Sequence, residues 1–289
     1  MQQDAERASI HQDVSQQTRG GNPNTTITTD AAVDSSLNLC SRLLLMMNIG
    51  EPPLGIDGPS TMRWDTGTLR SFTDRHFRPP GVHQLQPDKP QIGRLFTAVN
   101  LKKIGGFRIA WTVNLADHLR LIEDPSSSSG VVALFSCVSF LRFQHRCVPP
   151  QNQLFPTSPI TETLRTLALL LPQNDAATQA WLRSQELDPL LTECGSLATH
   201  ERRFEAFAHW HNRLVVLKQA LDEARPRTLA QWWFDRRNGV QWYTFWVAIL
   251  VFLVTIFFGL VQSVEGGLQV SSLESSIPPF RISKSHKLR

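Results

Sequence analysis

Cysteine is scarce in this sequence, and the cysteines that are present lie far apart. The four of them, Cys40, Cys137, Cys147 and Cys194, form no CxxC pair and no close set of cysteines and histidines with metal-ligand spacing. A disulfide scaffold or a structural zinc site needs tighter spacing than this. The spacing therefore favours free thiols in a reducing compartment, and we expect the protein to hold neither a metal nor another cofactor.

The short motifs that carry common catalytic chemistry are also missing. Neither GxGxxG nor GxxxxGK[ST] occurs, so no phosphate-binding loop is predicted, and there is no GxSxG nucleophile elbow. His209 and His211 flank Trp210, but on a helix they would point about 160° apart and could not share a metal. The least poor acid–base candidates are the neighbours Asp117 and His118, for which a capping or structural role is the alternative.

Basic residues are not concentrated in one region, although the formal net charge is +4. No stripe of lysine and arginine interleaved with aromatics appears, so nucleic acid is not an expected partner. The N-terminal MQQDAERASI is polar, which argues against a secretory signal. Gln2 stands where myristoylation needs glycine, and SHKLR is neither a prenylation box nor a peroxisomal address.

Aromatic residues are absent from the first 36 positions, which are rich in Gln, Thr, Ser, Asn and Asp. Such a stretch buries too little apolar surface to offset its ordering entropy, so residues 1–36 are predicted to be a disordered tail. Residues 37–92 are predicted to be irregular because EPPLGIDGPS, RPPG and PDKP interrupt them. This segment contains one short amphipathic helix, Leu37–Met47.

The sequence pattern of residues 93–226 predicts a folded α+β domain. Gly105–Val113 and Val131–Phe143 are rich in β-branched and aromatic residues and are predicted strands, with a helical turn and the loop EDPSSSSG between them. One helix is predicted to begin with Ser158 as its cap and to stop at Pro172. A longer helix is predicted from Thr199 to Ala224.

The longer helix carries an apolar seam. Residues at 3-4-3-4-3 spacing form it: Phe207, Trp210, Leu214, Leu217, Leu221 and Ala224. This spacing predicts packing either on the strands of the same chain or on another chain. The expected fold class is therefore α+β, with a small strand-containing cytosolic region, then helices, one C-terminal transmembrane helix and a disordered N-terminal tail.

Only one hydrophobic run in the sequence is long enough to cross a membrane. Trp242–Leu260 contains no charge, proline or amide side chain, and about 20 such residues span a bilayer. Trp242, Tyr243 and Trp246 cluster at one end of the run, where an aromatic belt is expected, and Leu260 lies near the other. The rest of the chain is too small to enclose an all-apolar helix, so residues 240–264 are predicted to be transmembrane and residues 265–289 a polar tail.

Arginines indicate the direction of this span. The twenty residues before the span contain four, Arg225, Arg227, Arg236 and Arg237, and the twenty after it contain one, Arg281. The basic C-terminus FRISKSHKLR favours the opposite direction, but it begins about twenty residues from the span. The positive-inside rule therefore places the large N-terminal part in the cytosol. Because the span lies so near the C-terminus, we expect tail-anchored insertion into the endoplasmic reticulum or another internal membrane.

Two features beside and within the span suggest further contacts. Residues 227–239 are predicted to form an amphipathic helix whose Trp232 and Trp233 lie in the headgroup layer or pack on the soluble domain. Small residues recur every four positions along the span, at Thr255, Gly259, Ser263 and Gly267. This spacing predicts close pairing of two membrane helices, and hence a homo-oligomer; the alternative is a glycine-permitted helix end.

The blocks TLAQWWFDRRNGVQWYTFWVAILVFLVTIFFGLVQSVEGGLQV, HWHNRLVVLKQALDEARP, TETLRTLALLLPQ and FRIAWTVNLADHLRL resemble a family of filamentous-fungal membrane proteins without assigned activity. The likeness runs from Arg94 to Val270. The resemblance implies a cytosolic α+β region anchored by one C-terminal helix, and a role as an accessory protein in specialised-metabolite pathways. It supplies no catalytic residues. Ser136 and Cys137 stand where relatives look more histidine-rich, which argues against a metal site.

These features support two functional hypotheses. The leading hypothesis is a non-catalytic interaction or scaffold protein that gathers an unknown cytosolic partner at an internal membrane. The alternative is an accessory protein or enzyme of a fungal specialised-metabolite pathway that acts on a lipophilic substrate, with Asp117 and His118 as acid and base. The enzymatic hypothesis requires these two residues to line a concave apolar cavity. A homo-oligomeric pore would need a polar lumen face, which Trp242–Val261 lacks.

Overall fold

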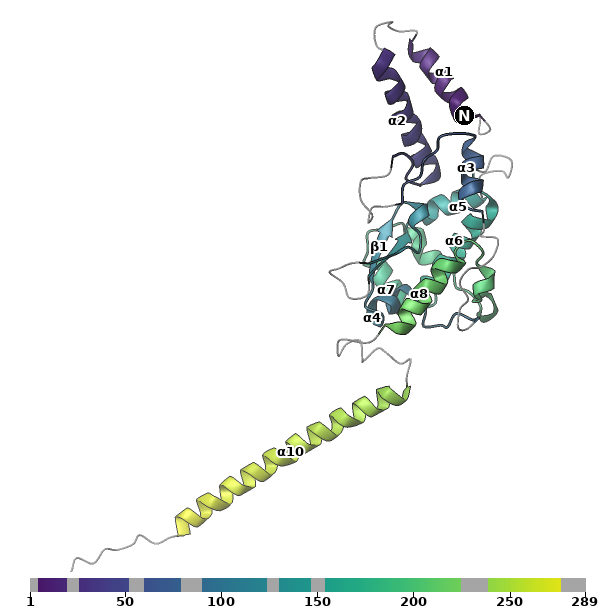
Figure 1. Cartoon of the computed structure of the whole chain (residues 1–289). Coiled ribbons are helices and arrows are strands. Elements are labelled where there is room, and N and C mark those ends of the chain that lie inside the picture. The colour runs from purple at the N-terminus through teal and green to yellow at the C-terminus, as the bar shows by residue number, and fades with distance from the viewer. Residues whose placement is uncertain are drawn as a thin grey trace, which may run out of the picture. The chain divides into compact units, whose positions relative to one another are not determined.

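The computed structural model describes residues 5–19, 26–51, 60–78, 90–123, 130–146, 154–224 and 239–276. Figure 1 shows the chain, which divides into two compact units, Met1–Phe234 and Asp235–Arg289. The first unit mixes helices with a small sheet, and the second contains one long helix. The expected mixture of helices and strands with one C-terminal apolar helix is confirmed.

A three-stranded sheet lies at the centre of the first unit. Its strands are β1 (Arg108–Thr112), β2 (Leu121–Ile122) and β3 (Val131–Phe135), in the order β1-β3-β2. β1 runs parallel to β3 with Arg108 opposite Val131, and β2 runs antiparallel to it. Every residue of β3 is buried, which explains its unbroken apolar sequence. β1 lies within the strand predicted at Gly105–Val113, after a turn in which Gly106 has φ of 72°.

The second predicted strand, Val131–Phe143, is wrong beyond Phe135. The chain turns there and forms α5 (Val138–Arg146), in which Val138 and Leu141 are buried and Phe143 is 56% exposed. The start of α5 is capped by Asp188, whose carboxylate accepts the main-chain N–H of Ser139 at 2.6 Å. This cap lies 49 residues further along the chain, so local sequence does not reveal it.

Two predicted helix starts are also corrected. α6 (Thr157–Leu170) has Pro156 at its cap position instead of Ser158. The helix predicted from Thr199 begins only at α8 (His211–Glu223), after the 3₁₀ turns η4 (Thr199–Glu201) and η5 (Phe204–Ala206). The buried Glu162 carboxylate on α6 causes this late start, because it accepts the N–H groups of Ala208, His209 and Trp210 at 2.9, 2.8 and 2.7 Å.

The apolar seam packs inside its own chain. Phe207, Trp210, Leu214, Leu217 and Leu221 are all buried in the same core as β3 and α6, and Ala224 is half-buried. The other short elements around this core are α3 (Leu69–His76), α4 (Ala98–Lys103), η1 (Leu115–Asp117), α7 (Ala176–Arg183) and η3 (Pro189–Glu193). The intramolecular alternative for the seam therefore holds.

The N-terminal part differs from the predicted disordered tail at residues 1–36. Two helices occupy most of it, α1 (Arg7–Arg19) and α2 (Thr26–Leu45), and they pack against each other (Figure 1). The predicted boundary at residue 37 falls inside α2, where Val33, Leu37 and Leu45 are buried on one side. A few apolar residues on one side of α2 are enough to order this part of the chain, because α1 packs against α2.

The second unit consists of α10 (Gly239–Ser276). The helix contains all of the predicted span at 240–264 and continues into the segment predicted as a polar tail from 265. The predicted juxtamembrane helix falls on residues 227–239, of which only Gly239 is described. The remaining part of the predicted tail, 277–289, lies outside the described residues as well.

Candidate functional site

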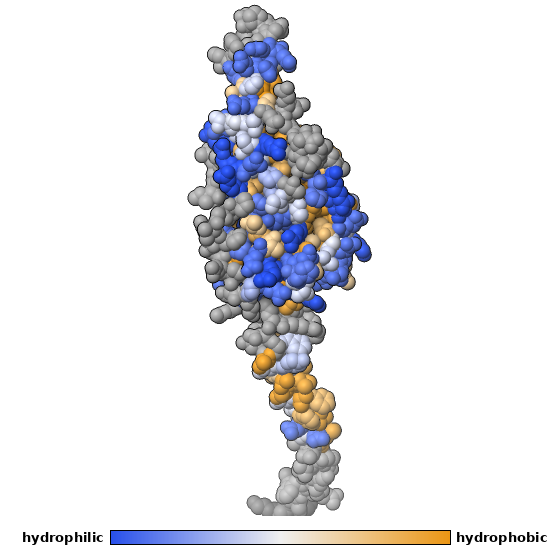
Figure 2. Space-filling model, turned by 90° about the vertical axis from the view of Figure 1, so that its right-hand side faces the viewer, coloured by the Kyte–Doolittle hydropathy of each residue, from blue (hydrophilic) through white to orange (hydrophobic). Residues whose placement is uncertain are grey.

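The most distinctive feature of the described chain is the apolar surface of α10. Among the described residues it is the one helix long and apolar enough to cross a membrane; its apolar stretch is Trp242–Leu268, 27 residues, and its most apolar 18-residue window has a mean hydropathy of 2.6 with no buried residue. Figure 2 shows the apolar part of this helix in orange, while the visible face of the first unit is mostly blue. Phe252, Leu253 and Phe257 are 64%, 57% and 63% exposed. Such a helix requires lipid or another protein around it.

The two ends of this apolar stretch differ. Trp242 lies with its ring centroid 5.2 Å from that of Tyr243 and 6.0 Å from that of Trp246, so the three aromatics form one cluster. Leu260, towards the other end, is 63% exposed. The helix carries no charged residue from Gly239 to Val264, and Glu265 is the first one. Twenty-six charge-free helical residues extend about 39 Å, more than the bilayer core of about 30 Å.

The predicted pairing face is open in the structure. The hydroxyls of Thr255 and Ser263 donate to the carbonyls of Val251 and Gly259 at 2.8 and 2.9 Å, so neither hydroxyl needs another partner. A Cβ atom added to Gly259 or Gly267 would meet no atom within 4 Å. The face is therefore available for close approach of a second helix, and pairing itself stays a prediction.

Asp117 is a buried structural carboxylate. It lies in η1 and is 4% exposed. Its oxygens accept the main-chain N–H of Ser60 at 3.0 Å and the side-chain amide of Asn114 at 2.7 Å, and they form an ion pair with Arg120 at 3.2 Å. These contacts join η1 to a loop 57 residues away in sequence. The carboxylate has no open side from which to act on a substrate.

His118 is held even more tightly, because both ring nitrogens have partners and its exposure is 0%. Nδ1 accepts the N–H of Phe135 at 3.2 Å, so the proton must be on Nε2, which lies 2.7 Å from the Thr166 hydroxyl. That hydroxyl donates onward to the carbonyl of Thr163. Burial, and secondarily the charge of Arg213, lower the pKa of His118 to about 3. A neutral histidine that is hydrogen-bonded through both ring nitrogens positions β3 and α6.

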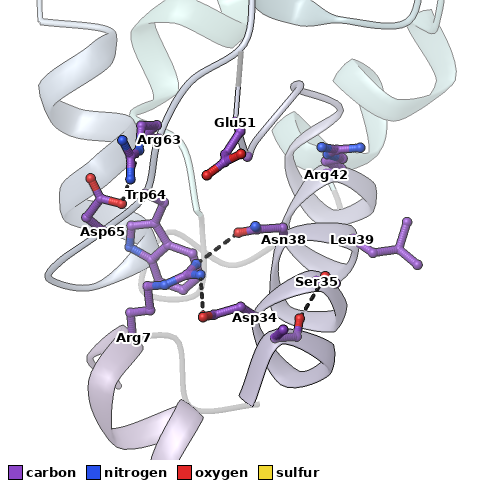
Figure 3. Close-up of a pocket in the computed structure, with 12 residues that line it drawn as sticks. Arg7, Asp34, Ser35, Asn38, Leu39, Arg42, Glu51, Arg63, Trp64 and Asp65 are labelled. Carbon is purple, nitrogen blue, oxygen red and sulfur yellow. Dashed lines mark hydrogen bonds and ion pairs between the residues drawn. The ribbon is translucent and has the colours of Figure 1, made fainter. Parts of the chain in front are cut away.

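A pocket of about 720 Å³ lies elsewhere, between the α1–α2 pair and the loop around Trp64 (Figure 3). It is lined by Arg7, Ala31, Asp34, Ser35, Asn38, Leu39, Arg42, Gly50, Glu51, Arg63, Trp64 and Asp65. Three arginines and three carboxylates face it, so its charges balance. Neither Asp117 nor His118 lines it, and it is polar, so it does not provide the apolar cavity that the enzymatic hypothesis requires.

Arg7 holds this pocket together. Its guanidinium donates to Asp34 at 2.9 Å and to Asn38 at 3.1 Å, both on α2, and lies 5.1 Å from the ring centroid of Trp64. Figure 3 shows Arg7 directed at these two α2 side chains. The pairs are 27 and 31 residues apart, so no sequence motif signals them. The arrangement fixes α1 on α2.

The cysteines of the described part are free thiols, as the spacing predicts. Cys40 is exposed, while Cys137 and Cys194 are half-buried. Burial raises the pKa of Cys194 to about 12 and raises that of Cys137, so neither is a reactive thiolate at neutral pH. No group of three or more His, Cys, Asp or Glu side chains that could hold a metal occurs among the residues that the structure describes.

No family model, curated protein or solved structure matches this chain. The resemblance to fungal membrane proteins stays a prediction.

Proposed function

We propose that the protein is a single-pass membrane protein, anchored by α10, whose N-terminal unit is a non-catalytic interaction domain on the cytosolic side of an internal membrane. The observation that carries this proposal is a helix that is charge-free from Gly239 to Val264 and whose most apolar part has no buried residue. A scaffold of this kind gathers its partner at the membrane surface.

Energetics favour lipid around this helix. Removing one large apolar side chain from water contributes about 1.5–3 kcal/mol, and the span exposes more than ten of them. All backbone hydrogen bonds of a helix are internal, so the bilayer leaves none of them unsatisfied. The Trp242–Trp246 aromatics supply the interfacial anchor at the end nearer the N-terminal unit.

The orientation follows from flanking arginines. Arg236 and Arg237 lie directly before the helix, whereas Glu265 and Glu274 follow its charge-free part. Cytoplasmic flanks are enriched in arginine and lysine, which supports a cytosolic N-terminal unit.

A non-catalytic role is supported by the geometry of the best acid–base candidates. Asp117 and His118 have all their polar atoms engaged within the fold, and neither lines the pocket around Arg7. The pocket around Arg7 is lined mainly by charged and polar side chains whose charges compensate one another, which does not suit a lipophilic substrate.

Membrane extraction tests the anchor directly. Leu253→Arg combined with Phe257→Arg places two charges at the centre of the span, each costing about 2.5–3.5 kcal/mol there. We expect the unmodified chain to stay in the pellet after alkaline carbonate washing of microsomes and the double variant to move to the supernatant.

Val264→Arg is the matched control, because it adds the same charge at the end of the span, where the headgroups accept it. This variant should remain in the pellet. An unmodified chain that is soluble without aggregating contradicts the proposal. An N-terminal tag that microsomes protect from added protease would reverse the orientation.

A further inference from the structure

The outer face of α2 is exposed and uncharged. It consists of Ala32, Ser36, Leu39 and Leu43, with Ser35 and Cys40 beside them, and all are exposed. Leu39 and Leu43 are 55% and 67% exposed, more than any other leucine that the structure describes in the first unit. We propose that this face pairs with the same face of a second copy of the chain, the two α2 helices running antiparallel about a two-fold axis.

The polar groups of this face do not require water. The hydroxyls of Ser35 and Ser36 donate to the carbonyls of Ala31 and Ala32 at 2.8 Å, so covering them leaves no donor without an acceptor. Arg42 lies on the flank, where its Nε donates to the carbonyl of Ile49. Since the face itself carries no charge, it complements a second uncharged surface and not an acidic or basic partner.

The order of side-chain sizes along the face indicates which partner would pack on it. The first half is small, Ala32 and Ser36, and the second half is large, Leu39 and Leu43. An antiparallel copy with its two-fold axis between positions 37 and 38 places Leu43 of one chain on Ala32 of the other, and Leu39 on Ser36. Small against large fills space evenly, whereas a parallel copy would set leucine on leucine and leave voids beside alanine.

The same pattern distinguishes a second copy from a lipid surface. A helix lying on a bilayer gains from bulky apolar residues along its whole length and from basic flanks. Here only one half of the face is bulky, and the flanking Arg42 is engaged with the main chain. The self-complementary order of sizes therefore favours a second copy.

The limited size of the face links this inference to the proposed anchor, on which it rests. Ala31–Leu44 is about 21 Å long, and one helix pair of that length buries less than the roughly 1,200 Å² of a stable soluble interface. Copies held in one bilayer meet at a much higher effective concentration. A two-fold axis also suits two copies that enter the membrane in the same direction.

Disulfide trapping in membranes tests the pairing. In a Cys40→Ser background, we compare the double variant Ala32→Cys plus Leu43→Cys with each single variant, using full-length protein in oxidised proteoliposomes. The antiparallel pair brings position 32 of one copy against position 43 of the other, so only the double variant should give a linked dimer. Within one chain the two positions are about 16 Å apart, too far for a disulfide.

Controls separate the alternatives. The other cysteines are present in every variant, so a bond through them would appear in all lanes. Adding Leu39→Asp, which changes an exposed side chain, should abolish the linked dimer while the circular dichroism spectrum stays the same. Linked dimers in the single variants would show a parallel arrangement, and no dimer in the double variant would show that α2 does not pair; either result overturns the proposal.

The same proteoliposomes, washed with carbonate, report on the anchor independently. If the protein stays in the pellet but forms no 32–43 bond, the proposed pairing is wrong and the proposed anchor is supported. If the protein leaves the membrane, the proposed anchor is wrong. Protection of Cys40 in the unmodified chain from an impermeant maleimide, with no 32–43 bond in the double variant, would assign the α2 face to lipid instead.

Discussion

The two units of this chain treat apolar side chains in opposite ways. In the N-terminal unit Leu134, Phe135 and Leu214 are 0% exposed, whereas in α10 Leu253 and Phe257 are 57% and 63% exposed. The residue types are the same, so the difference lies in the medium that each unit is built for. The first unit assembles its own apolar interior from distant segments, and the second requires lipid or another protein around its apolar surface.

The largest effect should come from placing a charge at matched positions in the two units. Leu134→Asp puts a carboxylate in the central strand and should destabilise the N-terminal unit by more than about 4 kcal/mol. Leu253→Asp should leave that unit's stability unchanged and weaken only membrane retention. Urea titration of full-length protein in detergent, followed by proteolysis of the N-terminal unit, measures the stability of that unit in both variants. Equal loss of stability in the two variants would contradict the separation of the units.

Acid should distinguish the two units as well. His118 has its pKa lowered to about 3 when folded, below its ordinary value of 6.5, so the unfolded chain binds the proton more readily. The stability from this residue is complete above pH 6.5 and is lost as pH falls towards 3, an effect on the order of a few kcal/mol.

His118→Asn tests this linkage through the slope of stability against pH, because a lower stability alone would not be informative. The slope of the variant between pH 6.5 and 4 should be shallower than that of the unmodified chain. α10 has no Asp, Glu or His from Gly239 to Val264, so its helicity in lipid should not change over the same range. An unchanged slope in His118→Asn would show that other groups control the acid response.

A smaller effect is expected at the remote cap of α8. Glu162→Gln keeps the size of the side chain but replaces an anionic acceptor of three N–H groups, which should cost about 2–3 kcal/mol. Glu205→Gln is the control, since the Glu205 side chain is 70% exposed. Hydrogen exchange should rise at Ala208–Trp210 in the first variant only. No increase there would show that the carboxylate does not fix the start of α8.

The smallest effect should be local to the α1–α2 pair. Arg7→Ala removes contacts to Asp34, Asn38 and Trp64, and because Asp34 is half exposed we expect about 1 kcal/mol or less. The result should be faster hydrogen exchange in α1, with β3 unchanged. Arg63→Ala, at an exposed ion pair, is the control and should change neither region. Faster exchange throughout the unit would show that α1 belongs to the main cooperative core.

The predictions that succeeded and failed in the N-terminal unit differ in the range of their interactions. The strand within Gly105–Val113 was visible because side-chain type and the turn at Gly106 are local. The end of β3, the start of α8 and the α1–α2 pair were missed because Asp188, Glu162 and Arg7 act from 49, 46 and 27 residues away. The polar pocket was unpredictable for the same reason, and the structural role of His118 emerged only with its partners Phe135 and Thr166.

The sequence alone determined α10, its charge-free length and the asymmetry of its flanks. A helix bonds each N–H to a carbonyl four residues away, and an apolar one of this length needs nothing else from the chain to be stable in lipid. Only the tertiary structure decided where the elements of the N-terminal unit begin and end, and that Asp117 and His118 are structural. In that unit the caps, partners and coverings come from segments far apart in the chain, and no local pattern encodes them.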